Sequence, residues 1–317
     1  MTTIQRSADV PETLTGRRLD QAVAQLWPEY SRSRLQTWIK AGKLLLAGEV
    51  VVPRTLVQAG QRVSLSVTLE HATEAQAEAI ALAVLYRDEH LLIIDKPAGL
   101  VVHPGAGNTS GTLMNALLHD SPGLSELPRA GIVHRLDKDT SGVLVVARSL
   151  PAHTALVAAL QAREISREYQ AICQGVVTGG GEVNAPIGRH PRNRLRMAVV
   201  ERGRPAVTHY RIGRRFRAHT QLNVQLETGR THQIRVHMAH VGCPLVGDPV
   251  YGGRPKFPAG CDDELRRLLQ QFNRQALHAR RLGFSHPVSG EDLSFESPMP
   301  QDMVDLGAAL AANLKAS

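Results

Sequence analysis

Several features that mark particular protein classes are scarce in this sequence of 317 residues. Its three cysteines, Cys173, Cys243 and Cys261, are widely spaced and form no CxxC pair, so neither a disulfide framework nor a zinc finger is indicated. No apolar run approaches the roughly 18 residues that span a bilayer, and the opening MTTIQRSADV lacks the apolar core of a signal peptide. We therefore expect a cytoplasmic protein with no membrane partner.

Lysine and aromatic residues are also rare. Lysine occurs six times among the 37 basic residues, so arginine dominates a net charge of +8. The planar guanidinium group suits phosphates and base edges, which favours a nucleic-acid partner; a GC-rich genome, which also enriches arginine, is the alternative. Two Trp, five Tyr and five Phe leave few side chains that could stack on a nucleobase.

Residues 14–70 have the pattern of a small separate unit. Apolar residues repeat at helical spacing over 19–26, and a second helix is expected from about 31 to 42. Short strands are expected at 44–46, 50–52 and 63–67. This arrangement resembles an S4 RNA-binding domain, with a solvated basic helix face as the alternative. The resemblance implies RNA contacts by four basic side chains: Arg32, Arg34, Lys40 and Lys43.

Beyond an Ala/Glu-rich linker at residues 71–83, apolar runs alternate with turn residues, and helical stretches are fewer. Strands are expected at 91–94, 143–146, 169–173, 222–226 and 234–236. Helices are expected at 112–119, 151–162, 263–273 and 301–314. The pattern predicts an α+β protein, in which a mixed, mainly antiparallel sheet with flanking helices spans residues 84–302. The S4-like unit at 14–70 precedes this domain, and a C-terminal helix or tail at 303–317 follows it.

The most informative segment is GIVHRLDKDTSGVLVVAR at 131–148. Asp137 lies there in a polar turn before the buried run 143–147, and the local pattern fits either a catalytic acid or an Asx turn. The string resembles the central motif of the RluA family of RNA pseudouridine synthases, whose HRLD aspartate is the essential catalytic residue. The resemblance implies the pseudouridine synthase fold, and isomerisation of uridine by Asp137 without a cofactor.

Pseudouridine formation breaks the N1–C1′ bond and joins C5 to C1′, with no redox step. Attack on C1′, attack on the base and removal of a sugar proton are all open roles for Asp137. The resemblance makes Arg235 its ion-pair partner, and makes Tyr169 the ring that stacks on the base and accepts the final proton. Ile234 and Val236 are expected to complete the pocket wall. Periodicity alone would make Tyr169 a strand-core residue, and composition alone would make Arg235 one more phosphate-contacting or surface arginine.

Other polar residues near these motifs receive different interpretations. Arg135 is by resemblance a candidate to fill the gap left by a flipped-out uridine or to contact the RNA backbone, and a structural salt bridge is the alternative. His134 is expected to be structural. The histidines at 232, 237 and 240 fit neither HExxH nor a zinc-finger pair, so no metal site is expected.

Residues 187–217 hold ten arginines and one acid, a density that predicts contact with a polyanion. The contacts are expected from Arg189, Arg192, Arg194 and Arg196. The string PIGRHPRNRLRMAV resembles its counterpart in the D-type large-subunit ribosomal RNA synthases. The resemblance implies large-subunit rRNA as partner, free or in pre-ribosomal particles, with helix 69 as the target and no obligate protein partner. Another rRNA or tRNA uridine is the alternative.

Two functions of other classes also stay open. One is a non-catalytic S4-bearing RNA-binding or ribosome-assembly factor. The other is an RNA N-glycosidase or a metal-dependent nuclease, which would need a second carboxylate or a metal cluster.

Overall fold

The computed structural model describes residues 2–28, 30, 32–69, 75–105, 107–193 and 196–315. The chain divides into two compact units, Met1–Glu74 and Ala75–Ser317. No helix in the described ranges is both long and apolar enough to cross a bilayer.

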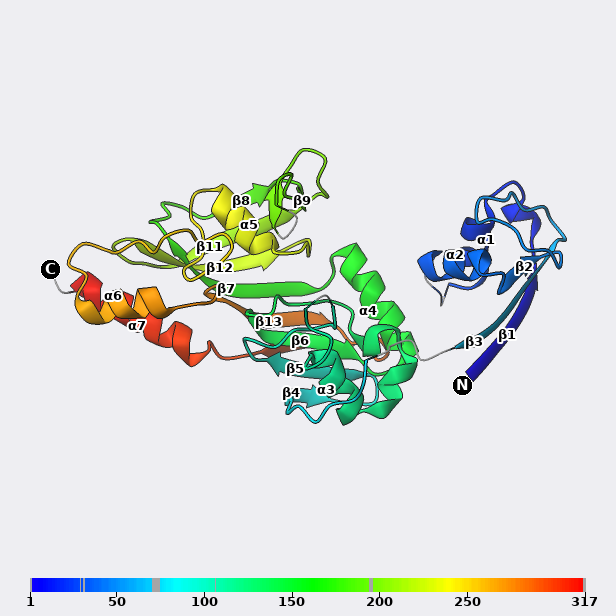
Figure 1. Cartoon of the computed structure of the whole chain (residues 1–317), viewed down its shortest axis with the longest axis horizontal. Helices are drawn as coiled ribbons and strands as arrows, with labels where there is room; N and C mark the ends of the chain where they lie inside the picture. The colour runs from blue at the N-terminus through cyan, green and yellow to red at the C-terminus, as the bar shows by residue number, and fades with distance from the viewer. Residues whose placement is uncertain are drawn as a thin grey trace. The chain divides into compact units, whose positions relative to one another are not determined.

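The N-terminal unit combines a small antiparallel sheet with two helices (Figure 1). Its elements are β1 Thr2–Asp9, α1 Leu19–Leu26, α2 Arg32–Lys40, β2 Leu44–Leu46 and β3 Arg62–Leu69, with a 3₁₀ turn at Glu12–Leu14. The strand order is β1-β3-β2. Leu19 and Val23 of α1 and Leu35 and Ile39 of α2 are fully buried, which confirms the apolar faces predicted for both helices.

Two expectations for this unit need correction. The unit begins before residue 14, because β1 pairs with β3 along its whole length and its alternating Ile4 and Ala8 pack on the core. The strand expected at 50–52 is wrong, since Val50 and Val52 are each 65% exposed and no strand in the described part of the chain pairs with them. A short apolar run becomes a strand only where a partner strand takes its backbone hydrogen bonds.

The second unit is built on a nine-stranded mixed sheet. Its strands are β4 Ala83–Arg87, β5 Leu91–Lys96, β6 Ser141–Ala147, β7 Ser166–Gln174, β8 Gly181–Asn184, β11 Val207–Arg215, β12 His219–Leu226, β13 Leu277–Ser285 and β14 Asp292–Glu296. Their order is β4-β5-β6-β13-β7-β12-β11-β8, with β14 on β13. All pairs are antiparallel except β6 with β13, which confirms the mixed, mainly antiparallel sheet.

Helices and a small second sheet complete this unit. The helices are α3 Leu113–Asp120, α4 Leu150–Ala162, α5 Gln233–His240, α6 Asp263–Gln271 and α7 Gln301–Lys315, with 3₁₀ turns at Pro122–Glu126 and Pro128–Gly131. The arginine-rich segment forms the two-stranded sheet of β9 Ile187–Arg189 and β10 Met197–Val199. Figure 1 shows α6 and α7 packed together at one end of the unit.

Both ends of the second unit extend beyond the limits expected from sequence. Residues 75–82, assigned to the linker, are tied to α3, because Asn115 Nδ2 donates to Gln76 O at 2.7 Å and Glu78 N donates to Asn115 O at 3.0 Å. Helix α7, expected as a separate terminal segment, buries Met303 and Leu306 in one cluster with residues of α6. The terminal helix is therefore part of the unit's core.

The strand expected at 234–236 is wrong, because this segment is the first turn of α5. Apolar side chains at 234, 236 and 238 imitate the two-residue period of a strand, but residues 233–238 are all buried. A helix enclosed on all sides carries no amphipathic period that could identify it. Gln233 fixes the helix start, since its Oε1 accepts hydrogen bonds from Thr228 Oγ1 at 2.8 Å and Arg230 N at 3.0 Å.

Candidate active site

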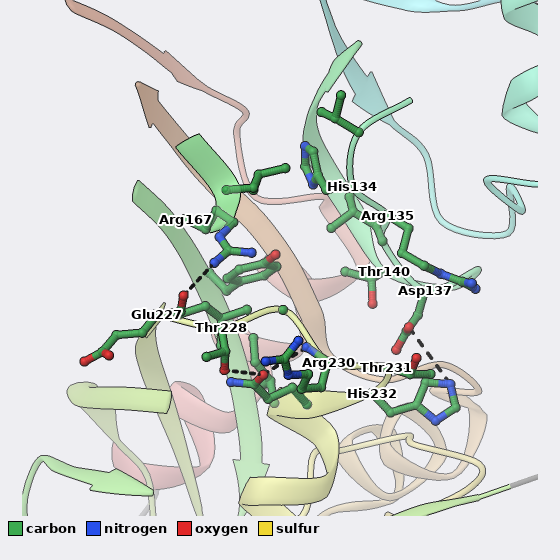
Figure 2. A pocket seen from close by; sticks show the side chains of 18 of the residues that line it. His134, Arg135, Asp137, Thr140, Arg167, Glu227, Thr228, Arg230, Thr231 and His232 are labelled. Atoms are coloured by element: carbon green, nitrogen blue, oxygen red, sulfur yellow. Dashed lines mark hydrogen bonds and ion pairs between the residues drawn. The ribbon is translucent and has the colours of Figure 1, made fainter. Parts of the chain in front are cut away.

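A cavity of about 700 Å³ lies in the second unit. Its walls come from the loop 132–137, from β7 and from residues 226–235, which run from the end of β12 into α5. Asp137, Tyr169 and Arg235 all line it, so the fold brings the three predicted catalytic residues together from distant parts of the sequence. Figure 2 shows Asp137 facing His232 on one side of this cavity and Arg167 beside Glu227 on the other.

A buried lysine donates a hydrogen bond to the loop that carries Asp137. Lys96 is 1% exposed, and its Nζ donates to the carbonyl oxygens of Pro97, Leu100 and Lys138 at 2.8–2.9 Å. Burial lowers the pKa of Lys96 to about 8, although Asp139 and Asp137 oppose the shift. The bond to Lys138 O joins the end of β5 to the backbone directly after Asp137. The Asp137 carboxylate itself is 17% exposed and lines the cavity.

Arg235 bridges two carboxylates. Its Nη1 donates to Asp137 Oδ2 at 3.0 Å, while Nε and Nη2 donate to the two oxygens of Asp248 at 2.7 and 2.8 Å. Burial opposes the charged form, but the hydrogen bonds and charges of Asp248 and Asp137 raise the pKa of Arg235 above its ordinary value. Burial likewise opposes the ionisation of Asp248, and its bonds to Arg235 nevertheless lower its pKa. A cation is thus fixed beside Asp137.

His232 approaches Asp137 from another direction. Its Nε2 lies 4.0 Å from Asp137 Oδ1, and its backbone has the left-handed φ of 58°. The Tyr251 hydroxyl accepts the Met197 N–H at 2.8 Å and lies 2.9 Å from Nδ1 of His232. Burial lowers the pKa of His232, although the charge of Asp137 opposes this. When the Tyr251 hydroxyl donates to Nδ1, a neutral imidazole carries its proton on Nε2, toward Asp137.

Tyr169 stands in the middle of the sheet, where β7 pairs with β12 and β13. It is 8% exposed, and burial raises the pKa of its hydroxyl, with the charge of Arg167 opposing and that of Asp137 adding to the shift. Ile234 lines the same cavity. Val236 does not line it, but packs with Ile187 on another side of α5. Residues two apart share a face of a strand but not of a helix, and this explains why the expected pocket position of Val236 fails.

The predicted RNA-contacting residues lie in several environments. Arg135 lines the cavity, is exposed, and has no hydrogen bond or ion pair with any described residue. Arg189 and Arg192 are exposed on and after β9, and Arg196 lies over the Tyr251 ring at 5.2 Å. Arg194 falls outside the described residues.

In the N-terminal unit, the basic residues of α2 are not equivalent. Arg32 Nη2 contacts the buried Asp20 at 2.6 Å, and Arg34 lies over the Trp38 ring at 5.1 Å. Lys40 and Lys43 are exposed. Arg32 and Arg34 thus have structural contacts, whereas both lysines face solvent.

The three histidines considered as metal ligands have different partners. His237 contacts Thr208 Oγ1 and Ala185 O at 2.9 Å each, His232 contacts Tyr251, and His240 is exposed. Among the described residues, no group of three His, Cys, Asp or Glu side chains is arranged to hold a metal ion.

Four residues of this site were not identified from the sequence: Arg167, His232, Asp248 and Tyr251. Arg167 stands two residues before Tyr169, and alternation along β7 would place both on one face. Asp248 and Tyr251 belong to the string GDPVYGG, which has the composition of a turn. Nothing local indicates that its acid is buried against an arginine 13 residues away.

Comparisons with known proteins match both units of the chain. A family model described as RNA pseudouridylate synthase matches residues 90–240, and one described as S4 domain matches residues 17–63. A ribosomal large subunit pseudouridine synthase D from Xanthomonas campestris is 58% identical over 96% of this chain and 92% of its own length. Relatives with the same name from Pseudomonas aeruginosa and Escherichia coli K12 are 56% and 52% identical, over 99% and 98% of this chain and 98% and 96% of their own lengths.

Solved structures carry the same fold. Human RNA Pseudouridylate Synthase Domain Containing 4 superposes with a TM-score of 0.57 at 26% identity, over 72% of this chain and 93% of that one. Human RNA Pseudouridylate Synthase Domain Containing 1, at 23% identity and a TM-score of 0.55, matches in fold over 76% of this chain and 97% of that one.

Proposed function

Because this chain belongs to the RNA pseudouridine synthases, and within them to the D type that acts on the large ribosomal subunit and carries an S4 domain, we propose that it isomerises uridines in the loop of helix 69 of large-subunit rRNA. We place the reaction in the cytoplasm, where rRNA is transcribed and assembled in a bacterium. The observation that carries the catalytic part is the Asp137–Arg235–Asp248 network at the wall of a cavity that Tyr169 also lines.

The reaction needs one ionised carboxylate, and the network supplies it. Arg235 neutralises and orients Asp137 without leaving its own place, because Asp248 holds the other edge of the guanidinium. Asp137 presents an oxygen to the cavity for attack on the ribose or the base, or for removal of a sugar proton. We infer that Tyr169 stacks on the detached uracil, and that its buried hydroxyl takes part in removing the C5 proton.

Target selection is proposed to involve both units. Arg135 has no protein partner among described residues, which leaves it available to occupy the gap of a flipped-out uridine. Arg189 and Arg192 on the β9 side, and Lys40 and Lys43 of the S4 domain, are exposed cations available for RNA phosphates.

The test is carbodiimide-adduct primer extension on large-subunit rRNA that lacks pseudouridine, treated with wild type or Asp137→Asn. We expect new stops in the helix 69 loop with wild type alone. Stops elsewhere would show that the protein is a pseudouridine synthase whose target is another uridine. Absence of stops on both free rRNA and precursor subunits would favour a non-catalytic assembly factor.

A further inference from the structure

Three arginines of the cavity wall stand outside the catalytic network. Arg167, Arg204 and Arg230 all line the cavity, and none of them forms an ion pair with a described carboxylate. Arg167 Nη2 donates to the backbone oxygen of Glu227 at 3.1 Å, and Arg230 Nε donates to Pro205 O at 3.1 Å. These two backbone contacts position the guanidinium groups of Arg167 and Arg230 but do not neutralise their charges.

The carboxylate of Glu227, a residue that also lines the cavity, already has two partners. Glu227 contacts Arg163 Nη1 at 2.8 Å through one oxygen and His209 Nε2 at 2.7 Å through the other. Burial lowers the pKa of Arg230, and the charges of Arg204, Arg163 and Arg167 add to the shift, so these guanidinium groups repel one another. A bound anion would relieve that repulsion.

The most deeply placed of the three also has an unused donor. Arg167 is 7% exposed, and its Nε has no hydrogen-bond partner among the described residues. Gly229 lies against it, since a Cβ at that position would come within 2.7 Å of Nη1. A buried donor without a partner is unfavourable, and the absence of a side chain at Gly229 leaves room for the guanidinium of Arg167.

Arg204 connects this cluster to the arginine-rich segment. Its backbone exchanges two hydrogen bonds with Ile187 of β9, at 2.8 and 2.9 Å. The same strand continues to Arg189, which is exposed, and Arg192 follows it. A chain of RNA phosphates passing along this segment would reach the cavity wall at Arg204.

We propose that Arg167, Arg204 and Arg230 form a phosphate site that binds one of the two phosphodiester groups flanking the target uridine. The proposal rests on the proposed function, because the substrate supplies the phosphate. A phosphodiester offers two oxygens that share a negative charge to the guanidinium groups that line this cavity. The site holds the RNA backbone beside the target nucleotide while Asp137 and Tyr169 act on the ribose and base.

The test measures binding of an RNA hairpin that carries the uridine located by primer extension. Three versions are compared: all phosphodiester, a methylphosphonate 5′ of the uridine, and a methylphosphonate 3′ of it, each with 2′-deoxy sugars at the same positions. The proteins are wild type, Arg230→Gln, Arg204→Gln and the control Arg267→Gln, whose residue is exposed on α6 and does not line the cavity. Arg204 is exposed, so its variant keeps the test open if Arg230→Gln fails to fold.

We expect one of the two methylphosphonates to raise the Kd of wild type and of Arg267→Gln about tenfold. The same methylphosphonate should raise the Kd of Arg230→Gln and of Arg204→Gln less than about twofold. Equal penalties in all four proteins, or no penalty at either linkage, would overturn the phosphate site. Isomerisation of the unmodified hairpin by wild type is scored separately. Its absence would count against the proposed function, while the Kd comparison would still decide the site.

Discussion

Arg235 holds Asp137 through one nitrogen, Nη1, at 3.0 Å. Nε and Nη2 of the same guanidinium donate to Asp248, whose side chain is fully buried. The two carboxylates are therefore not equivalent: one faces the cavity, and the other fixes the cation from inside the protein. Electrostatic support for Asp137 is built before any substrate arrives, which avoids reorganisation during the reaction.

Asp248→Asn removes the carboxylate that binds Nε and Nη2 of Arg235 and leaves this buried guanidinium with Asp137 as its remaining ion-pair partner. We expect it to lower the free energy of unfolding by about 2 kcal/mol, because two charge-assisted hydrogen bonds in the interior are weakened or lost. The rate of isomerisation should fall as well, since Arg235 loses its orientation. Urea unfolding and single-turnover kinetics measure the two effects, with the exposed Asp305→Asn as control. Unchanged stability and rate in Asp248→Asn would show that the pair has no such role.

Tyr251→Phe removes only the hydroxyl between Met197 N and His232 Nδ1. We expect the imidazole to lose its preference for the Nε2–H tautomer and kcat to fall several-fold with little change in KM. Nitrogen-15 NMR of the histidines reports the tautomer directly. If the spectrum of His232 is the same in both proteins, Tyr251 does not set the tautomer.

Acid sensitivity should arise in part from His134. Its Nε2 accepts the Val145 N–H at 3.2 Å, and burial together with the charge of Arg167 lowers its pKa to about 3. An unfolded chain binds a proton at this histidine near pH 6.5, whereas the folded one does not. The contribution of the neutral His134 to the free energy of unfolding is therefore complete above pH 6.5. It is lost as the pH falls toward 3, with a slope of up to about 1.4 kcal/mol per pH unit.

Urea unfolding at pH 7, 6 and 5 measures this slope. We expect a shallower slope in His134→Asn than in wild type, whereas the exposed His119→Asn should retain the wild-type slope. His103 and His219, whose pKa values burial lowers to about 4, act in the same direction and remain in every variant. Equal slopes in all three proteins would show that His134 does not contribute to the pH dependence of stability.

Exposed arginines beside β9 should contribute through counterion release. Changing Arg189 and Arg192 to Ala together is expected to weaken RNA binding and to reduce the slope of log K against log salt by up to about one for each phosphate that is no longer neutralised. Arg196 is excluded from this test because it packs on Tyr251. Filter binding at several salt concentrations, with Arg267→Ala as control, measures the slope. A slope equal to that of wild type would mean that these side chains do not touch phosphates.

The sequence predicts the parts of this fold that have a distinct period. The strands around 143–146 and 169–173 and the helices around 151–162 and 263–273 occur as expected, within a few residues. The enclosed helix α5 was mistaken for a strand because burial on every side erased its period. Long-range pairing is invisible to such patterns, so the exposed Val50 and the added strand β1 were not anticipated.

The site, like the fold, was predictable from the sequence only in part. Family resemblance located Asp137, Tyr169 and Arg235, and the cavity contains all three. Asp248, which binds Arg235, and Tyr251, which contacts His232, lie in a turn-like string whose role depends on contacts across the fold. Arg32 had the composition of an RNA contact, but its guanidinium is bound to the buried Asp20 of a neighbouring helix. Composition indicates the charge of a side chain and not the partner that neutralises it.

Tritium release from a hairpin with [5-³H]uridine at the mapped position tests the role of Asp137 most directly. Pseudouridine formation expels the C5 hydrogen, so release into water counts turnovers. We predict no release by Asp137→Asn with RNA affinity within about twofold of wild type, since the Oδ1 and Nδ2 groups preserve the shape of the carboxylate. Asp139→Asn, a neutralised acid two residues along the same loop, should react at a rate close to wild type. Tritium release by Asp137→Asn at the wild-type rate would contradict the account.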